Sequence, residues 1–271
     1  MGSATREALS ESLRELDSTG TVGDNGSGRD LTTVSELFAV GRVVARTAHL
    51  RSALSDKAAP AEVKRQLVQT VFGSSVSERT LRLVSAAAAG RWSDADGFVA
   101  GLEELGIRAA VQSVGSDVSI EQELFEFGRY VASDAELELA LGSKLGDVQA
   151  KVALVESLLA GKASPQTVEI VRQLVQQPRG RRIRTLLRYA AGIAADQSNL
   201  TVATVTAAAP LTEGQLARLR AGLSSLYGRD VKINVIVDAS IMGGLRVQVG
   251  DDVIDGSVAS RLHDLKLQLA G

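Results

Sequence analysis

Cysteine is absent from the 271 residues of this chain, and aromatic residues and long apolar runs are scarce. Without cysteine there are no disulfides, thiolate metal ligands or cysteine nucleophiles, which suits a reducing compartment. Aromatic residues make up 3% of the chain, too few for a platform on which bases or sugars stack. No run of about 18 uncharged apolar residues occurs, so we expect no membrane-spanning segment. The N-terminus also lacks the apolar core of a signal peptide.

A large excess of charge of one sign is missing as well. The 30 basic and 32 acidic side chains leave a net charge of −2, so no overall field attracts the chain to nucleic acid or acidic membranes. With 45% hydrophobic residues, the chain is long enough to bury a core in two or three domains. These features predict a soluble globular protein whose partners are recognised by shape and local patches.

Hydrophobic residues recur with a helical period over roughly the first 197 residues. Residues 4–16 predict a short amphipathic helix, and the Gly- and Ser-rich stretch 18–30 predicts a loop. A second helix is expected to begin at Thr33, which stands in capping-box spacing with Glu36. Further helices are expected near 60–72, near 78–90 with Ser77 as N-cap, and over 94–111.

An internal repeat is the most informative feature of this helical part. The run LFAVGR at 37–42 returns as LFEFGR at 124–129, an offset of 87 residues that persists over several helices. Chance resemblance between Ala- and Leu-rich helices is the alternative, but the shared Gly-Arg pair favours a true duplication. We therefore predict a first helical bundle over 1–112, which includes the loop 18–30, and a second, duplicated bundle over 113–197.

Beyond residue 198 the hydrophobic period changes from 3.6 to 2. Strands are expected over 200–209, 231–238 and 245–249. A helix between the first two is opened by Thr212 and Gln215 in capping-box spacing and closed at Gly228. Ser257 can cap a last helix. Residues 198–271 thus form a small mixed α/β domain, and the expected fold class is α+β, mainly α.

Catalytic, cofactor and metal sites find no support in the sequence. His49 and His263 are isolated, and no phosphate-binding loop is complete. The aspartates 251, 252 and 255 suggest a metal site or an acid/base pair, but a turn between Gly250 and Gly256 explains them better. We therefore predict neither catalytic residues nor a cofactor nor a metal.

The basic run PRGRRIRTLLR at 178–188 is the one feature that can bind phosphate. A nucleic-acid-binding helical repeat protein is therefore the alternative function, to be tested by salt-dependent affinity. The run is interpreted in preference as a solvated, positive helix face, because only Tyr189 supplies an aromatic ring beside it. A small-molecule enzyme would need a polar pocket that the sequence does not display.

The segment 231–258 resembles the signature of the ATP synthase delta subunit family, which includes the mitochondrial oligomycin-sensitivity conferral protein. Ala208, Pro210, Leu211 and Thr212 supply the run that usually precedes it. The duplicated helical part resembles actinobacterial delta subunits, of the kind not fused to a membrane anchor. The matching signature positions, which we expect to be structural, are Val231, Ile233, Val237, Asp238, Ile241, Gly243, Gly244, Leu245, Val247, Gln248, Gly250, Asp251, Asp255, Gly256 and Ser257.

This resemblance implies a non-catalytic stator subunit of an F-type ATP synthase. The helical part would grip the N-terminal segments of the alpha subunits in the catalytic head, and the C-terminal domain would hold the b subunits of the peripheral stalk. The expected location is the cytoplasmic face of a bacterial cell membrane, as a peripheral subunit with no nucleic-acid partner. Candidate partner-binding residues are Ala4, Ala8, Leu9, Phe98, Leu102, Leu105, Leu262, Leu265 and Leu269.

Overall fold

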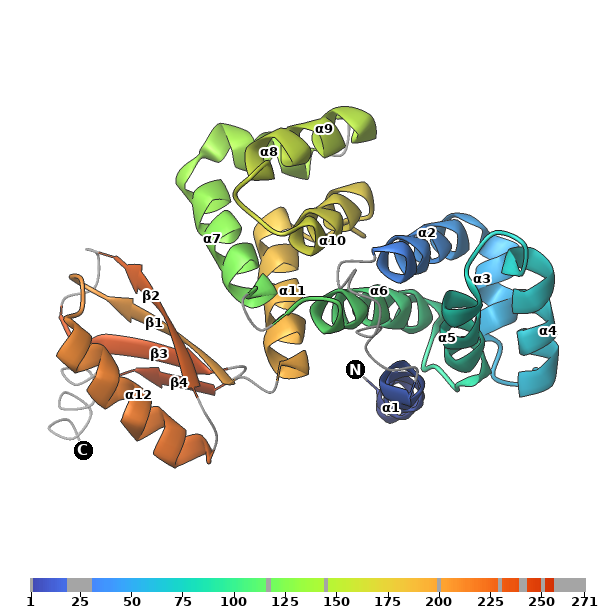
Figure 1. Ribbon diagram of the computed structural model, residues 1–271, viewed down its shortest axis with the longest axis horizontal. Coiled ribbons are helices and arrows are strands. Elements are labelled where there is room, and N and C mark those ends of the chain that lie inside the picture. Colours follow the sequence, from blue (N-terminus) through green and yellow to red (C-terminus); the bar gives the residue numbers. More distant parts are fainter. Residues whose placement is uncertain are drawn as a thin grey trace, which may run out of the picture. The chain divides into compact units, whose positions relative to one another are not determined.

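The computed structural model (Figure 1) describes residues 2–18, 31–115, 118–143, 146–198, 201–228, 231–238, 243–249 and 252–255. The chain divides into two compact units, Met1–Ala194 and Ala195–Gly271. Helices build the first unit, and a sheet with one described helix builds the second. The predicted fold class, mainly helical α+β with an internal duplication, is confirmed. Within the described parts of the chain, no helix is both long enough and apolar enough to cross a membrane.

Eleven helices are described from the first unit into the start of the second. They are α1 (Ser3–Ser18), α2 (Thr32–Arg46), α3 (Ala48–Ser55), α4 (Ala61–Phe72), α5 (Glu78–Ala89), α6 (Ala95–Gln112), α7 (Ile120–Ser133), α8 (Ala135–Gly142), α9 (Val148–Leu159), α10 (Pro165–Gln176) and α11 (Ile183–Gln197). The predicted helices over 4–16, 60–72, 78–90 and 94–111 agree with these bounds to within a few residues.

The helices repeat at the offset that the sequence shows. Adding 87 to the bounds of α3, α4 and α5 gives 135–142, 148–159 and 165–176, which are the bounds of α8, α9 and α10. Helix α2 shifted in the same way gives 119–133, one residue more than α7. Four consecutive helices therefore recur in the same order and with lengths equal to within one residue, as expected of a duplication.

A polar cluster is duplicated together with the helices. The Glu36 carboxylate accepts hydrogen bonds from the backbone nitrogen and hydroxyl of Ser77 and from the Thr80 hydroxyl, at 2.6–3.0 Å. In the second repeat, the Glu123 carboxylate accepts the same bonds from the backbone and hydroxyl of Ser164, at 2.6–3.0 Å. In both repeats a glutamate thus holds the N-cap serine of a helix 41 residues away.

Glu36 is therefore not part of a capping box, and that prediction is wrong. Helix α2 begins after Leu31, no side chain caps it, and Thr33 is buried within its first turn. Thr33 and Glu36 have the spacing of a capping box. The Glu36 carboxylate instead accepts several hydrogen bonds from Ser77 and Thr80, whereas a capping box would give it one bond from a backbone amide. The predicted cap at Ser77 is confirmed, because its hydroxyl accepts from the Thr80 nitrogen.

Helix α6 lies at the centre of the first unit and is the helix that both repeats share. It packs against α1, α2 and α5 of the first repeat and against α10 of the second. Nearly every residue from Phe98 to Ala110 is buried, including Glu103, Glu104 and Arg108. Two glycines make room for rings: a Cβ on Gly101 would lie 2.1 Å from the Trp92 ring, and one on Gly106 would lie 2.3 Å from the Phe38 ring. One continuous hydrophobic core runs through both repeats.

The second unit contains β1 (Thr201–Ala207), α12 (Glu213–Tyr227), β2 (Val231–Val237), β3 (Leu245–Val249) and β4 (Asp252–Asp255). The strands form one sheet in the order β2-β1-β3-β4, with β1 parallel to β2 and antiparallel to β3. Alternate residues of β1, β2 and β3 form a small core with Leu223 of α12. The capping box of Thr212 with Gln215 and the left-handed end at Gly228 are confirmed.

The predicted turn over the aspartates is wrong for 252–255. These residues form β4, in which Asp252 pairs with Val249 and Asp255 with Arg246. Backbone pairing with β3 outweighs the turn preference of aspartate, because an edge strand tolerates polar side chains on its open side. The helix predicted after Ser257 lies outside the described residues.

Candidate functional site

The two copies of one helix, α5 and α10, have different surroundings. Around α5 lie α1, α2, α4 and α6. Around α10, α7 corresponds to α2 and α9 to α4, while α6 takes the place that α1 has beside α5. Each helix has four close neighbours in the described structure: the fourth neighbour of α10 is α2 of the first repeat, whereas the fourth neighbour of α5 is α6.

The side chains along one edge of α10 are more buried than those at the matching positions of α5. Gln166, Glu169 and Gln173 of α10 are 1%, 8% and 2% exposed. Their counterparts 87 residues earlier in α5 are Arg79, Arg82 and Ala86, of which Arg82 is exposed and the other two are partly exposed. The same edge of the same helix is therefore covered in the second repeat and open in the first.

Helix α2 covers this edge of α10 through a specific contact. The Arg42 guanidinium donates a hydrogen bond to the Gln173 side chain, whose amide nitrogen in turn donates to Gln177 at 3.0 Å. Burial lowers the pKa of Arg42, while the nearby Glu169 carboxylate acts in the opposite direction. Helix α2 of the protein itself thus packs against both α6 and α10.

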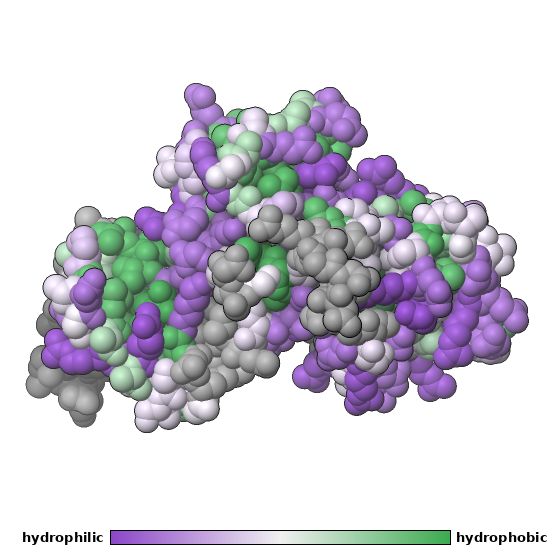
Figure 2. All heavy atoms as spheres, viewed as in Figure 1, coloured by the Kyte–Doolittle hydropathy of each residue, from purple (hydrophilic) through white to green (hydrophobic). Residues whose placement is uncertain are grey.

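The matching surface of the first repeat lies along α1 and α5, and we call it the α1–α5 face. On α1 it presents Glu7, Glu11 and Glu15, spaced one helical turn apart. On α5 it presents Arg82, Ala86 and Ala89, and Arg82 approaches Glu15 at 4.0 Å. Figure 2 shows the hydrophilic surface over α1. The face therefore combines an acidic edge with small side chains that allow a close approach.

Five of the nine predicted partner-binding residues are buried in the helical unit. Ala8 and Leu9 are buried, Phe98, Leu102 and Leu105 are fully buried in the core, and Ala4 is partly exposed on α1. Leu262, Leu265 and Leu269 lie outside the described residues. A role for these nine residues in binding stays a prediction.

The signature residues of the second unit serve its backbone where they are described. Gly243 and Gly244 have φ angles of 80° and 85°, in the left-handed region that favours glycine. Val231 and Val247 are buried in its core, with Ile233 and Leu245 packed against them. Val237 is exposed at the end of β2. Asp238 follows β2, Gln248 is exposed on β3, and Asp255 ends β4; Ile241, Gly250, Asp251, Gly256 and Ser257 lie outside the described residues.

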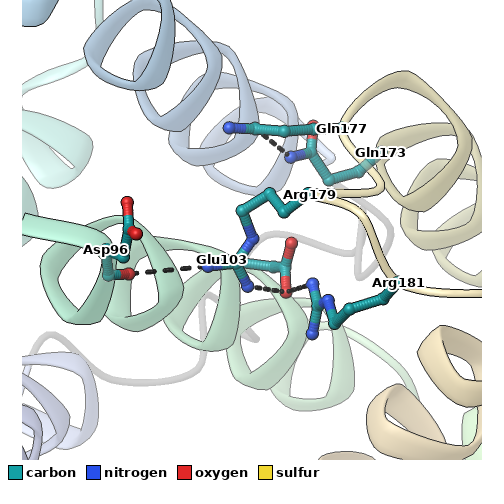
Figure 3. Close-up of polar contacts among 6 residues, drawn as sticks. All are labelled: Asp96, Glu103, Gln173, Gln177, Arg179 and Arg181. Atoms are coloured by element: carbon teal, nitrogen blue, oxygen red, sulfur yellow. Dashed lines mark hydrogen bonds and ion pairs between the residues drawn. The ribbon is translucent and has the colours of Figure 1, made fainter.

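Three arginines of the basic run form ion pairs within the protein. Arg179 and Arg181 both donate to the Glu103 carboxylate, at 2.9 and 2.7 Å, and Arg184 pairs with Glu138 at 2.9 Å (Figure 3 shows the first two). The Arg181 guanidinium also lies 5.2 Å from the centre of the Tyr189 ring. The interpretation as a simple solvated helix face is therefore incomplete, because two of these arginines join the repeats.

Sequence reasoning missed the α1–α5 face, although a signal for it exists. Aligning the repeats at 87 residues places Ala86 against Gln173 and Arg82 against Glu169, a change of charge or size on one edge, while the buried Thr80 and Val84 match Thr167 and Val171. Such a difference between duplicates indicates different neighbours. Within the described residues no cluster of three or more potential metal ligands occurs.

Comparison with known proteins gives one consistent result. The family model described as ATP synthase delta (OSCP) subunit matches residues 107–269. A protein of Leifsonia xyli subsp. xyli called ATP synthase subunit delta is 54% identical over 271 residues, covering 100% of both chains. One of the same name from Streptomyces griseus subsp. griseus is 41% identical over 274 residues, also covering 100% of both. A chain in the cryo-EM structure of the Toxoplasma gondii mitochondrial ATP synthase hexamer is 20% identical, with a TM-score of 0.43 over 62% of this chain and 96% of that chain, a likeness too loose to support an argument.

Proposed function

The chain belongs to the ATP synthase delta (OSCP) subunit family, and from this premise we propose that it joins the catalytic head to the peripheral stalk without catalysing a reaction itself. As a delta subunit it is part of the stator of an F-type ATP synthase. A stator needs stable contacts at both ends so that the rotor turns against a fixed head. Binding surfaces, not reactive groups, are what this role demands.

The α1–α5 face is the proposed contact with the head, and its ligand is the N-terminal segment of an alpha subunit in helical form. The observation that carries this proposal is the helix α2 seated against α6 and α10 in the second repeat. Because α1 and α5 stand in the same relation as α6 and α10, the first repeat offers an external helix the position that α2 fills internally. Packing of a helix into such a groove is a common mode of peptide recognition.

The chemistry of the face specifies the ligand further. Ala86 and Ala89 favour an apolar ridge on the incoming helix, because small side chains let two helices approach closely. Glu7 and Glu11 are exposed and favour basic residues along one edge of that helix. The proposed ligand is therefore an amphipathic helix with a basic border, and its binding should weaken as salt is added.

The C-terminal unit is the proposed contact with the stalk. The b subunits would bind there, with Leu262, Leu265 and Leu269 as candidate contacts. Held by these partners, the chain would lie at the cytoplasmic face of the membrane as a peripheral subunit. The two contacts use different units of the chain, so each can be impaired while the other is retained.

Peptide binding to the full chain tests the proposal for the head. An alpha-subunit N-terminal peptide, followed by fluorescence anisotropy, should bind at micromolar concentration or tighter. Ala86→Glu should weaken binding at least tenfold, since it places a charge in the groove. Ala153→Glu, the same change at an exposed position of α9, should alter it less than twofold. Equal effects of the two variants would refute the α1–α5 face as the site.

A second measurement addresses the stalk and the absence of catalysis. Leu265→Asp should reduce capture by the C-terminal segment of a b subunit while leaving the alpha peptide bound. The purified chain alone should hydrolyse no ATP. Recovery of neither partner, or hydrolysis that co-purifies with the chain, would contradict the connector role.

A further inference from the structure

The two helical repeats are joined by polar bonds as well as by their shared core. Gln166 of α10 donates to the Ser113 hydroxyl at the end of α6, at 3.3 Å. Gln173 of α10 accepts from Arg42 of α2. At the far end of α10, Arg179 and Arg181 reach Glu103 of α6. We name the last group, Glu103 with Arg179 and Arg181, the inter-repeat latch.

Glu103 is the centre of the latch. Its side chain is 2% exposed and one oxygen accepts from both guanidinium groups, at 2.9 and 2.7 Å. Figure 3 shows both arginines reaching it from the segment between α10 and α11, with Arg179 also directed to the Asp96 carbonyl at 3.5 Å. A carboxylate removed from water in this way depends on its partners, because an unpaired buried charge is strongly unfavourable.

The backbone of the arginine-bearing segment is held in an uncommon conformation. Arg179 has φ 48° and Gly180 has φ 75°. For a residue other than glycine, the left-handed region is energetically unfavourable. Such a residue stays in this conformation only where contacts with its surroundings stabilise it. Here the contact is Glu103: the left-handed pair turns the segment so that residues on both sides of Gly180 meet the same carboxylate.

We propose that the inter-repeat latch is a conformational device that holds the second repeat at a fixed angle on α6. Since α6 also packs against α1, α2 and α5, a segment pinned to α6 is pinned to the first repeat. With the latch open, the shared core and the remaining polar bonds alone hold the second repeat on α6, so its angle varies more widely and the α2–α10 contact loosens. The latch thus sets the stiffness of the helical unit, independently of which face binds the head.

Distance measurements on the full chain test this directly. The natural absence of cysteine allows Ser52→Cys in α3 and Ser157→Cys in α9, both exposed, to carry spin labels for pulsed electron resonance. Glu103→Gln removes the charge of the latch. Arg179→Gly removes one arm while supplying the residue that its backbone conformation favours. Glu138→Gln breaks the Arg184 pair, an ion pair of similar length inside the second repeat.

The expected result is a distance distribution at least twice as wide in Glu103→Gln as in the labelled parent, at temperatures well below unfolding. Arg179→Gly should give an intermediate width, and Glu138→Gln the parent's width. A folded Glu103→Gln variant with the parent's distribution would overturn the proposal, as would equal broadening by Glu138→Gln. If Glu103→Gln loses its helical circular dichroism, Arg179→Gly decides: broadening supports the latch, and an unchanged width overturns it.

Discussion

Replacing Gly106 by alanine is the sharpest available test of the packing at the centre of the helical unit. The added Cβ would lie 2.3 and 2.6 Å from two atoms of the Phe38 ring, closer than non-bonded carbons approach. Phe38 is 1% exposed, so its ring lies inside the close-packed core and can move only if its neighbours move too.

Two opposing terms set the size of the effect. Overpacking a close-packed core costs about 1–3 kcal/mol. Exchanging glycine for alanine inside a helix contributes about 1 kcal/mol in the other direction. We therefore expect Gly106→Ala to lower the free energy of unfolding by up to about 2 kcal/mol, the difference between the two. Gly192→Ala in α11 is the matched control, because no atom lies within 4 Å of its added Cβ. It should raise the free energy of unfolding by up to about 1 kcal/mol.

Trp92 provides the assay, since it is the single tryptophan of the chain and is fully buried in the helical unit. Its fluorescence during urea unfolding reports this unit and not the C-terminal one. Phe38→Leu should cost less in the Gly106→Ala background than in the parent, because the smaller side chain relieves the contact. The reasoning is refuted if Gly106→Ala stabilises the unit as much as Gly192→Ala does.

Two further predictions concern the duplicated polar cluster and the inter-repeat contact. Ser77→Ala and Ser164→Ala each remove an N-cap hydroxyl bonded to a glutamate, so urea unfolding should show a loss of about 1–2 kcal/mol for each. A loss in one repeat only would contradict their equivalence. Burial, followed by the Glu104 and Glu103 carboxylates, raises the pKa of Tyr189 to about 12. The unfolded chain therefore loses the Tyr189 proton at a lower pH than the folded chain does. The stability that neutral Tyr189 contributes is present below about pH 10 and is lost as the pH rises towards about 12. Tyr189→Phe should diminish the loss of stability between pH 9 and pH 11, whereas Tyr130→Phe, at an exposed position, should leave it unchanged; identical pH profiles for both variants would refute the assignment.

Local features were predictable where a short stretch of chain determines them. The cap at Ser77, the capping box at Thr212 and the left-handed end at Gly228 all depend on residues within one helical turn. Glu36 was misassigned because its partner lies 41 residues away. The strand β4 was missed because its pairing with β3 decides its conformation, while aspartate by itself favours turns.

The candidate site was less accessible to sequence reasoning than the fold. Phe98, Leu102 and Leu105 have the apolar spacing of a helix face, and the same spacing serves a buried core and a binding groove alike. In the folded unit they are core residues. The α1–α5 face instead consists of charged and small residues, whose composition alone does not distinguish a binding surface from ordinary solvent-exposed helix.

By itself, the sequence determined the helical and strand periods, the offset of 87 residues between the repeats and the family signature, because each depends on the order of residues along the chain. The tertiary structure alone decided that α6 serves both repeats, that α2 closes the groove of the second repeat, and that the corresponding face of the first is open. The physical reason is that burial of a helix face depends on which distant helices pack on it. Two copies of one helix therefore have different exposed surfaces, although they follow the same pattern.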